Sequence, residues 1–308
     1  MSARRCFICG ADDWKAAALR TCGHCGVRVR GANYDADACA QARDTLLQPG
    51  PCVLTPDLPF AADAFTWRIA ASRHALAFWS MDEADAAALA FPHSPRLARG
   101  HLRPRAPAPP RVTLAMILRA DRLDACLDLW RQWRTSFAGA VFVVDAPAGE
   151  GPHGDGVRIV QRPLEGNFGA QRNAAQALAQ TPWVLQLDDD EKPSDALLGS
   201  LDALSAYSEA QNVVSVGFPR RNLVDGAWSD LWPDIQYRLN HRSVRFGGSV
   251  HERPITGGWR RTTIALDGVI DHHLDRSRVI ERSVRYEAMG AGGGRPGDEA
   301  ALLRPYRA

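Results

Sequence analysis

Short apolar runs alternate with stretches of helical period between residues 111 and 200. The apolar runs have the length of buried strands and lie at residues 112–118, 141–144, 157–160 and 183–187. The stretches between them predict helices over residues 121–137 and 168–180, and Pro193 and Ser194 are expected to begin another helix. Strands that alternate with helices predict an α/β fold with a parallel sheet and right-handed crossovers.

The chain before residue 111 carries weaker signals. Ala70–Ala90 is rich in alanine and predicts a helix. Residues 95–111 hold five arginines, five prolines and no acidic residue, a composition that predicts an extended linker. The sequence therefore suggests a small segment over residues 1–32, an uncharacterised region with the linker over 33–110, and an α/β domain over 111–308.

Composition and charge narrow the class of protein. With 45% hydrophobic and 23% charged residues among 308, the chain is neither a disordered protein nor a small disulfide-stapled scaffold. Its 37 basic and 35 acidic side chains nearly cancel, so no nucleic-acid partner is expected. No apolar run reaches the roughly 20 residues that span a bilayer, and the start lacks the apolar stretch of a signal peptide. We expect a cytoplasmic protein, which could also act at the inner face of the membrane.

Four cysteines near the start have the spacing of a metal site. Cys6, Cys9, Cys22 and Cys25 form C-x2-C-x12-C-x2-C, with Gly10, Gly23 and Gly26 beside them. Two such turns can close four thiolates around a structural Zn²⁺, as in a zinc ribbon. The alternatives are two disulfides or a redox pair, which a cytoplasmic setting disfavours. The other three cysteines, Cys39, Cys52 and Cys126, are expected to be small buried apolar groups.

A run of four carboxylates follows the fourth predicted strand. Asp188–Glu191 would lie with Asp145 at the carboxyl ends of the strands, where ligands of such sheets bind. Close carboxylates repel one another, and Mg²⁺ or Mn²⁺ relieves the repulsion while keeping sites for phosphate oxygens. The alternative is an acidic first turn favoured by a helix dipole.

Four segments in order complete a pattern. They are Asn167–Asn173, Thr181–Glu191, Phe246–Glu252 and Asp271–His273, the last followed by a helix that reaches Tyr286. Together they resemble family 2 glycosyltransferases, which have the GT-A fold, and among them the lipopolysaccharide-core glucosyltransferases. The resemblance covers about residues 111 to 290. Two early motifs depart from the family: Arg119–Asp121 stands where an Asn-Glu pair is usual, and the loop after Asp145 is reduced.

The resemblance implies a metal-dependent inverting glycosyltransferase. It would move a sugar from a nucleotide-diphosphate sugar, with a UDP-sugar as the expected donor, to a saccharide, lipid-linked or peptide acceptor. Such enzymes serve the synthesis of cell-envelope polysaccharides and use Mn²⁺ or Mg²⁺ at the donor site.

The same resemblance suggests donor-site residues. Asp145 would accept a hydrogen bond from the nucleobase, although it can equally cap its strand. Arg172 would meet the base or the diphosphate, and Asp188 the ribose or the metal. Asp190 would bind the metal directly, and His272 would be a further metal or phosphate contact, with His273 as its alternative.

An inverting transfer also needs a base for the acceptor proton. Glu252, after the Gly247-Gly248 pair, is the predicted base, with Asp234 and Asp225 as alternatives; a structural role for the His251-Glu252 pair stays open. The chain also offers arginines for an anionic substrate and tryptophans for stacking on an acceptor sugar, at Arg238, Arg242, Arg245, Trp228 and Trp232.

Two other functions compete with the transferase. The reduced loop after Asp145 motivates a zinc-ribbon binding or scaffold protein that carries a degenerate, inactive transferase domain. The basic residues around the cysteines motivate a nucleic-acid protein, against which the near-neutral charge argues.

Overall fold

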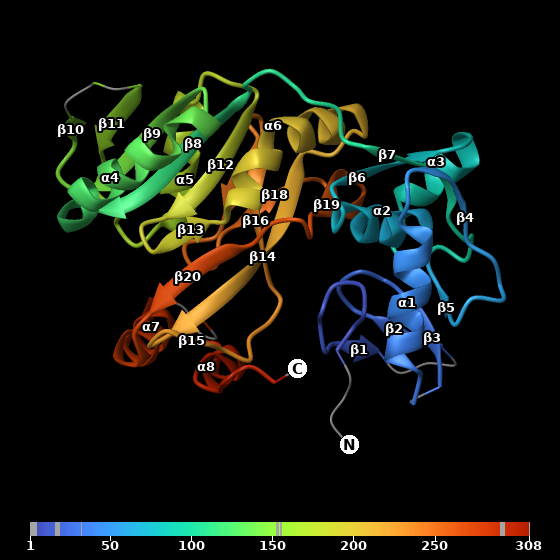
Figure 1. The fold of residues 1–308 in the computed structure, drawn as a ribbon. Helices are drawn as coiled ribbons and strands as arrows, with labels where there is room; N and C mark the ends of the chain where they lie inside the picture. Colours follow the sequence, from blue (N-terminus) through green and yellow to red (C-terminus); the bar gives the residue numbers. More distant parts are fainter. Residues whose placement is uncertain are drawn as a thin grey trace. The chain divides into compact units, whose positions relative to one another are not determined.

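The computed structural model describes residues 5–15, 19–31, 33–151, 154, 156–289 and 293–307. The chain forms two compact units, one of residues up to 106 together with 257–267, and one of residues 107–256 and 268–307. Each unit is mixed α/β, and Figure 1 follows the elements in chain order. No helix in the described ranges is long and apolar enough to cross a membrane.

The described residues of the first unit form two antiparallel sheets and three α-helices. One sheet has the order β1-β2-β3-β5 and the other β4-β7-β6. The strands of this unit are β1 Trp14–Lys15, β2 Leu19–Cys22, β3 Arg28–Arg30, β4 Gly50–Val53, β5 Phe60–Ala61, β6 Leu76–Ser80 and β7 Arg99–Pro104. The helices are α1 Ala36–Leu46, α2 Ala64–Ser72 and α3 Glu83–Leu89. The sheet that contains Cys22 thus includes a fourth strand, β5, which lies beyond the expected boundary at residue 32.

The single helix predicted over Ala70–Ala90 is wrong. Helix α2 ends at Ser72, and Ala75 adopts a left-handed φ of 55° that reverses the chain. Residues 76–80, with the sequence LAFWS, then pair with β7, and Asp82 caps α3 by accepting a hydrogen bond from the Asp85 amide at 2.8 Å. Alanine content favours a helix, but the pairing of residues 76–80 with β7 and the burial of Leu76, Ala77 and Phe78 outweigh that propensity.

The extended linker predicted over residues 95–111 also differs from the structure. Arg99–Pro104 is the central strand of its sheet, bonded to β4 on one side and β6 on the other. Residues 95–98 and 105–111 lie outside helices and strands. Residues 99–104 are a strand because β4 and β6, which are distant in sequence, pair with them. The composition of the segment carries no information about these partners.

A late segment completes the first unit. Residues 257–267 contain a short 3-10 turn, Trp259–Arg261, and β19, Thr262–Ile264. The Arg68 guanidinium donates to the Thr262 carbonyl at 2.9 Å, the Leu266 amide donates to Ser72 Oγ at 2.8 Å, and Arg105 pairs with Asp267. The α/β domain expected over 111–308 is therefore interrupted by a segment that packs on α2.

The second unit is built on one large sheet. Its strand order is β10-β11-β9-β8-β12-β16-β14-β20-β13, with β15 paired to β14. The first strands are β8 Val112–Arg119, β9 Gly139–Asp145, β10 Gly149–Glu150, β11 Val157–Gln161 and β12 Trp183–Asp188. The later ones are β13 Glu191–Pro193, β14 Ser215–Val224, β15 Ala227–Trp228, β16 Asp234–His241 and β20 Ile270–Leu274, while β17 Arg245–Gly247 and β18 Arg253–Ile255 form a separate pair.

The four strands predicted from the apolar runs are confirmed as β8, β9, β11 and β12, and they are mutually parallel. Strand β16 then pairs antiparallel with β12, so the sheet as a whole is mixed. The parallel part explains the near-continuous burial of β8 and β12.

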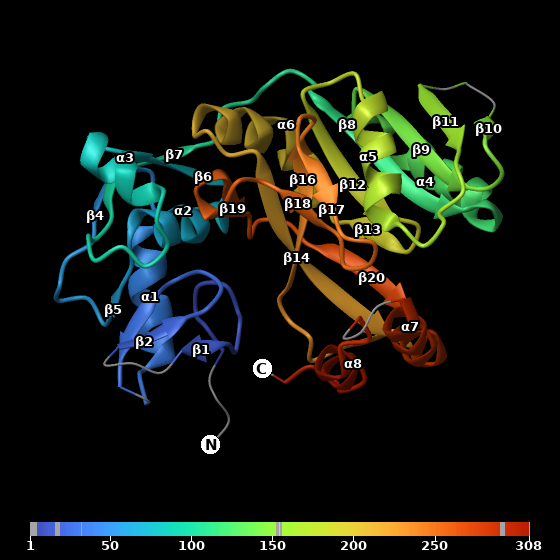
Figure 2. The ribbon, with the colours of Figure 1, turned by 180° about the vertical axis from the view of Figure 1, so that it is seen from behind.

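Helices of the second unit pack against its large sheet. They are α4 Leu123–Trp133, α5 Phe168–Leu178, α6 Asp195–Ala210, α7 Arg276–Met289 and α8 Pro296–Leu302. The crossovers through α4 and α5 run in opposite directions across the sheet, so right-handed connections place these helices on opposite faces (Figures 1 and 2). Small residues of α5 allow it to pack against β8, β9 and β12 in one core cluster. Asn167 and Ser194 cap α5 and α6, as expected of Ser194.

Two glycines near α6 should respond to alanine in opposite directions. Gly199 lies on an exposed helical position with open space around it, so Gly199→Ala should raise the free energy of unfolding by roughly 0.5–1 kcal/mol. At Gly268 an added Cβ would lie 2.5 Å from Leu197 Cβ and 2.7 Å from its Cα, so Gly268→Ala should lower it by roughly 1–3 kcal/mol. Urea unfolding followed by circular dichroism measures both, and shifts of the same sign would contradict this packing.

Candidate functional site

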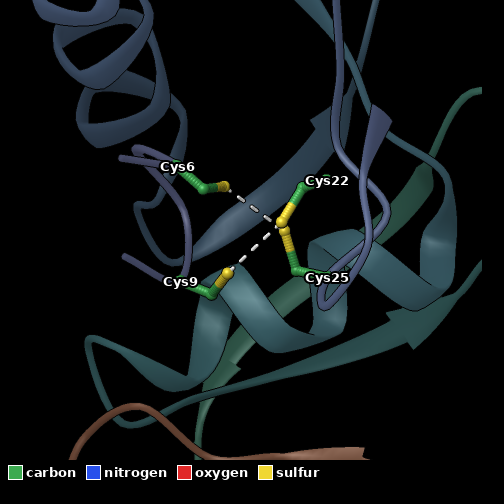
Figure 3. A group of neighbouring side chains, drawn as sticks. All are labelled: Cys6, Cys9, Cys22 and Cys25. Carbon is green, nitrogen blue, oxygen red and sulfur yellow. Dashed lines mark hydrogen bonds between the residues drawn. The ribbon is translucent and has the colours of Figure 1, made fainter. Parts of the chain in front are cut away.

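The four clustered cysteines converge from two turns of the first unit. Cys6 and Cys9 belong to one turn, Cys22 and Cys25 to the other, and all four are buried (Figure 3). The Sγ atoms of Cys6 and Cys25 are 3.6 Å apart, as are those of Cys9 and Cys22. A tetrahedral Zn²⁺ with sulfur at about 2.3 Å requires sulfur separations of about 3.8 Å. The group can therefore hold zinc, and all seven cysteines are free of disulfides.

The turn geometry is that expected around such an ion. The amides of Gly10 and Gly26 donate to the carbonyls of Cys6 and Cys22 at 2.7 and 3.0 Å, and both glycines have φ of +85°. Gly23 does not adopt positive φ, and the atoms nearest to an added Cβ there belong to the side chain of Asp13, which is exposed and can move away.

The cysteine group is tied to the rest of its unit. Thr66 of α2 donates to the Cys25 carbonyl at 2.6 Å, and Arg73 donates to the Ile8 carbonyl at 2.5 Å. Burial raises the pKa of Cys25, so several ionised thiols in this place need a cation. Cys39, by contrast, is a solitary buried thiol whose pKa burial raises to about 11, which keeps it protonated.

A cavity of about 320 Å³ lies in the second unit at the carboxyl ends of the parallel strands. Its wall includes the ends of β8, β9 and β12, the loop before β18, and side chains of α5, α7 and α8. The predicted residues Asp145, Arg172, Asp188, Asp190 and Glu252 all line it. This is the location that the sheet topology favours for a ligand.

Three buried arginines neutralise most of the acidic run. Asp188 accepts from Arg172 and Arg238, one through each carboxylate oxygen, at 2.6 Å in both cases. Glu191, fully buried, accepts from Arg220 at 2.9 Å and from Arg238 at 2.6 Å. Burial opposes ionisation of Asp188, but the neighbouring guanidinium groups outweigh it and hold its pKa well below the usual range.

Asp190 lies outside this arginine cluster. Its Oδ1 is 3.4 Å from His272 Nε2, and its Oδ2 is 3.3 Å from Arg278 of α7. Burial opposes ionisation of Asp190, but the contact with His272 outweighs it and lowers the pKa of Asp190 to about 2. Burial and the charge of Arg220 lower the pKa of His272. An oxygen and a ring nitrogen that face each other can bind Mn²⁺ or Mg²⁺ and leave positions for phosphate oxygens.

The structure distinguishes the two histidines. His272 is 1% exposed and faces Asp190, whereas the His273 side chain is exposed on the other face of β20. Of the two alternatives, the geometry supports His272 as the metal contact.

The candidate bases differ in their surroundings. Glu252 lines the cavity, and its Oε1 accepts from Arg172 Nε at 2.5 Å. Asp234 accepts from Arg220, Asn222 and Gln236, which leaves it little capacity for a substrate proton. Asp225 sits in the turn between β14 and β15, accepts from the Arg276 amide, and does not line the cavity.

The remaining predicted contacts fall in different places. Asp145 lines the cavity, but its Oδ1 already accepts from the Leu164 amide at 2.8 Å. Arg238 belongs to the buried cluster, while Arg242 and Arg245 do not line the cavity. Trp228 stacks on Tyr306 with ring centroids 3.8 Å apart and, like Trp232, is absent from the cavity wall, so the expected stacking platform for an acceptor is not found there.

The sequence pattern did not identify several residues of the site. Arg220 and Asn222 of β14 contact the acidic run and His272, and Arg278, Arg282 and Arg285 of α7 line the cavity. The spacing of the α7 arginines, at one helical face, was the available signal. For Arg220 and Asn222 the sequence holds no comparable signal, because the register of β14 against β16 and β20 brings them in.

The loop before β18 is held in an unusual conformation. His251, a non-glycine residue, has φ of +51°, and its Nε2 lies 2.6 Å from the Gly293 carbonyl. Its ring meets Tyr286 of α7 edge to face at 5.4 Å. Backbone held in this region beside a cavity is typical of functional loops, and here it positions the next residue, Glu252.

Comparison with known proteins adds little to this geometry. No protein-family model matches the chain. No curated protein matches it either. Two solved structures of S. aureus TarS show a partial likeness. One has 11% identity and a TM-score of 0.35 over 57% of this chain and 40% of that chain; the other, TarS 1–349, has 9% and 0.33 over 57% and 65%. The chain thus spans less than two thirds of each, and similarity this low does not establish a shared fold.

The cysteine group should bind zinc. We expect the protein purified without chelators to carry one Zn²⁺ per chain, measured by plasma mass spectrometry, and Cys9→Ser to lose it together with thermal stability of the first unit. The matched control is Cys39→Ser, the same change in the same unit outside the group. A fully zinc-loaded Cys9→Ser protein would refute the site.

Acid should selectively weaken the Arg220–Asp234 contact. Burial opposes ionisation of Asp234, but Arg220 and Asn222 lower its pKa to about 2, below the unfolded value of about 3.9. Its contribution to stability is therefore complete above pH 4 and is lost as pH falls toward 2. Asp234→Asn should be less stable than wild type by roughly 1.5–3 kcal/mol at pH 6.

This difference should shrink between pH 4 and pH 2 in urea unfolding. Asp121→Asn, a change at an exposed carboxylate, serves as the control. A stability difference between Asp234→Asn and wild type that stays constant with pH would contradict the lowered pKa of Asp234.

Proposed function

We propose that the second unit is a metal-dependent inverting glycosyltransferase that uses a nucleotide-diphosphate sugar. The observation that carries the proposal is the pairing of Asp190 with the buried His272. Asp190 and Glu252 line one cavity at the carboxyl ends of the strands, although His272 itself is not part of the wall. The pattern of motifs along the chain supports the same activity.

The donor set fits a hard divalent cation. Among the described residues, no third carboxylate, histidine or cysteine forms a metal-binding group with Asp190 and His272, which suits an ion that also takes phosphate oxygens. When bound there, Mn²⁺ or Mg²⁺ would stabilise the negative charge of the departing diphosphate. Asp188, with each oxygen held by an arginine, would act as a fixed anchor for Arg172 and Arg238 rather than as a ligand.

The arginines of α7 would bind the diphosphate. Arg278, Arg282 and Arg285 line the cavity, and Arg278 already approaches Asp190 at 3.3 Å. A guanidinium group can bind two phosphate oxygens at once, which orients the leaving group.

Glu252 would take the proton of the acceptor hydroxyl. As that oxygen forms its bond to the anomeric carbon, the bond from that carbon to the diphosphate breaks, and its electron pair leaves with the diphosphate. Arg172 Nε holds Oε1 of Glu252, and in the described chain Oε2 makes no hydrogen bond, so Oε2 would be the proton acceptor. The acceptor itself would be a saccharide, a lipid-linked saccharide or a peptide.

The scaffold alternative retains one supporting observation. Each oxygen of Asp188 is held by an arginine and Oδ1 of Asp145 by a backbone amide, so both carboxylates have reduced capacity to bind a nucleoside in this conformation. A protein of this kind would bind partners through its zinc unit and would show no metal-dependent affinity for nucleotides.

Calorimetric titration with UDP and GDP, with and without Mn²⁺, separates the two functions. We expect one nucleotide to bind only with Mn²⁺, and Asp190→Ala to abolish this binding while the fold persists. Asp189→Ala, the same change one residue away at a carboxylate held by Arg119, is the matched control.

Glu252→Gln supplies the catalytic arm of the experiment. It should keep nucleotide binding and lower the rate of sugar transfer roughly 10²–10⁴-fold. Full transfer by Asp190→Ala would exclude the proposed mechanism, and absence of binding to either nucleotide would favour the scaffold protein.

A further inference from the structure

Three neighbouring strands carry a row of polar side chains that leads to His272. The parallel register of β14 and β20 places Asn222 opposite His272, and the antiparallel register of β14 and β16 places Arg220 opposite Asp234. Asn222 is fully buried and His272 is 1% exposed. Buried polar groups at such positions must satisfy one another, so their hydrogen bonds determine which atoms carry protons.

Asp234 decides the orientation of the Asn222 amide. Its carboxylate is held by Arg220 at 2.6 Å and by Gln236 at 2.6 Å, and its Oδ2 lies 3.1 Å from Asn222 Nδ2. An ionised carboxylate only accepts hydrogen bonds, so the amide NH2 must face it. The opposite orientation would set two acceptor oxygens against each other. Asn222 Oδ1 is therefore the atom that faces His272.

The Asn222 oxygen in turn decides the tautomer of His272. It lies 2.7 Å from Nδ1, and because it can only accept, Nδ1 must carry the proton. In the neutral ring Nε2 then presents a lone pair. That lone pair faces Asp190 Oδ1 at 3.4 Å, so two acceptors point at one position.

We propose that Asn222, oriented by Asp234, is a positioning residue that holds His272 in its Nδ1–H tautomer and so prepares Nε2 and Asp190 to receive a divalent cation. The inference rests on the metal-dependent function proposed above, but it concerns metal binding before any nucleotide is present. Partners that orient a metal-binding histidine typically contribute 10–100-fold to metal affinity.

The test compares two leucine substitutions in the same sheet. Asn222→Leu removes the oxygen that faces His272. Asn240→Leu makes the same change at another fully buried asparagine, which bonds Ser215 and the Tyr237 carbonyl instead. Histidine ¹⁵N spectra of the full chain report the tautomer, with the His272 signals assigned by their loss in His272→Gln. Titration with Mn²⁺ alone, on protein with its cysteine site zinc-loaded, reports affinity.

We expect the Nδ1–H tautomer in wild type and in Asn240→Leu, and its loss in Asn222→Leu together with about 10–100-fold weaker Mn²⁺ binding. If Asn222→Leu does not fold, Asn222→Ser replaces it in the same measurements.

Three results would overturn the inference: an unchanged tautomer in Asn222→Leu, a doubly protonated His272 in metal-free wild type at neutral pH, or an equal loss of Mn²⁺ affinity in Asn240→Leu. A wild type with the expected tautomer but no Mn²⁺ binding would overturn the role in cation binding. If Mn²⁺ binds as expected and no sugar transfer is found, the inference stands and the proposed transferase fails.

Discussion

Neutralisation of the buried acidic run is the constraint on which the second unit depends. Asp188 and Glu191 lie beside Asp189 and Asp190 at the end of a central strand, where uncompensated carboxylates would oppose folding. Arg172, Arg220 and Arg238 come from α5, β14 and β16 and supply the opposite charge. Removal of one member would leave a buried charge without its partner, which is far more destabilising than the pair is stabilising.

This neutralisation also divides the carboxylates by role. Asp188 and Glu191 are paired with arginines, and Asp189 accepts a hydrogen bond from Arg119. Asp190 faces His272 through Oδ1 and Arg278 of α7 through Oδ2. Because the charge of a histidine is not permanent, the Oδ1 side of Asp190 remains available to a cation. Of the four adjacent acidic residues, Asp190 is therefore the one candidate metal ligand. The arginines determine this by pairing with the other three carboxylates.

The first unit depends on the group of four cysteines instead. Its strands are two to six residues long and its helices seven to eleven, so its stability does not come from regular elements alone. The cysteine group draws two turns together, and α2 and the residue after it bond directly to the backbone of those turns. Metal binding and folding would thus be coupled in this unit, as they are in small zinc domains.

The sequence by itself determined the parts that depend on local pattern. The strands β8, β9, β11 and β12 follow from continuous apolar runs, the cap at Ser194 from its local chemistry, and the cysteine site from its spacing. Each of these signals lies within a few residues, so no knowledge of distant partners was needed.

Only the tertiary structure decided the rest. Strand β7 arises in a Pro- and Arg-rich segment because β4 and β6 flank it, and residues 257–267 return to the first unit. The choice of His272 over His273 and the place of Asn222 follow from the register of β14 against its neighbours. The arginines that hold Asp188 come from α5 and β16, which the fold brings beside the end of β12. Register pairs residues 12 to 50 positions apart in the chain, and no local periodicity encodes it.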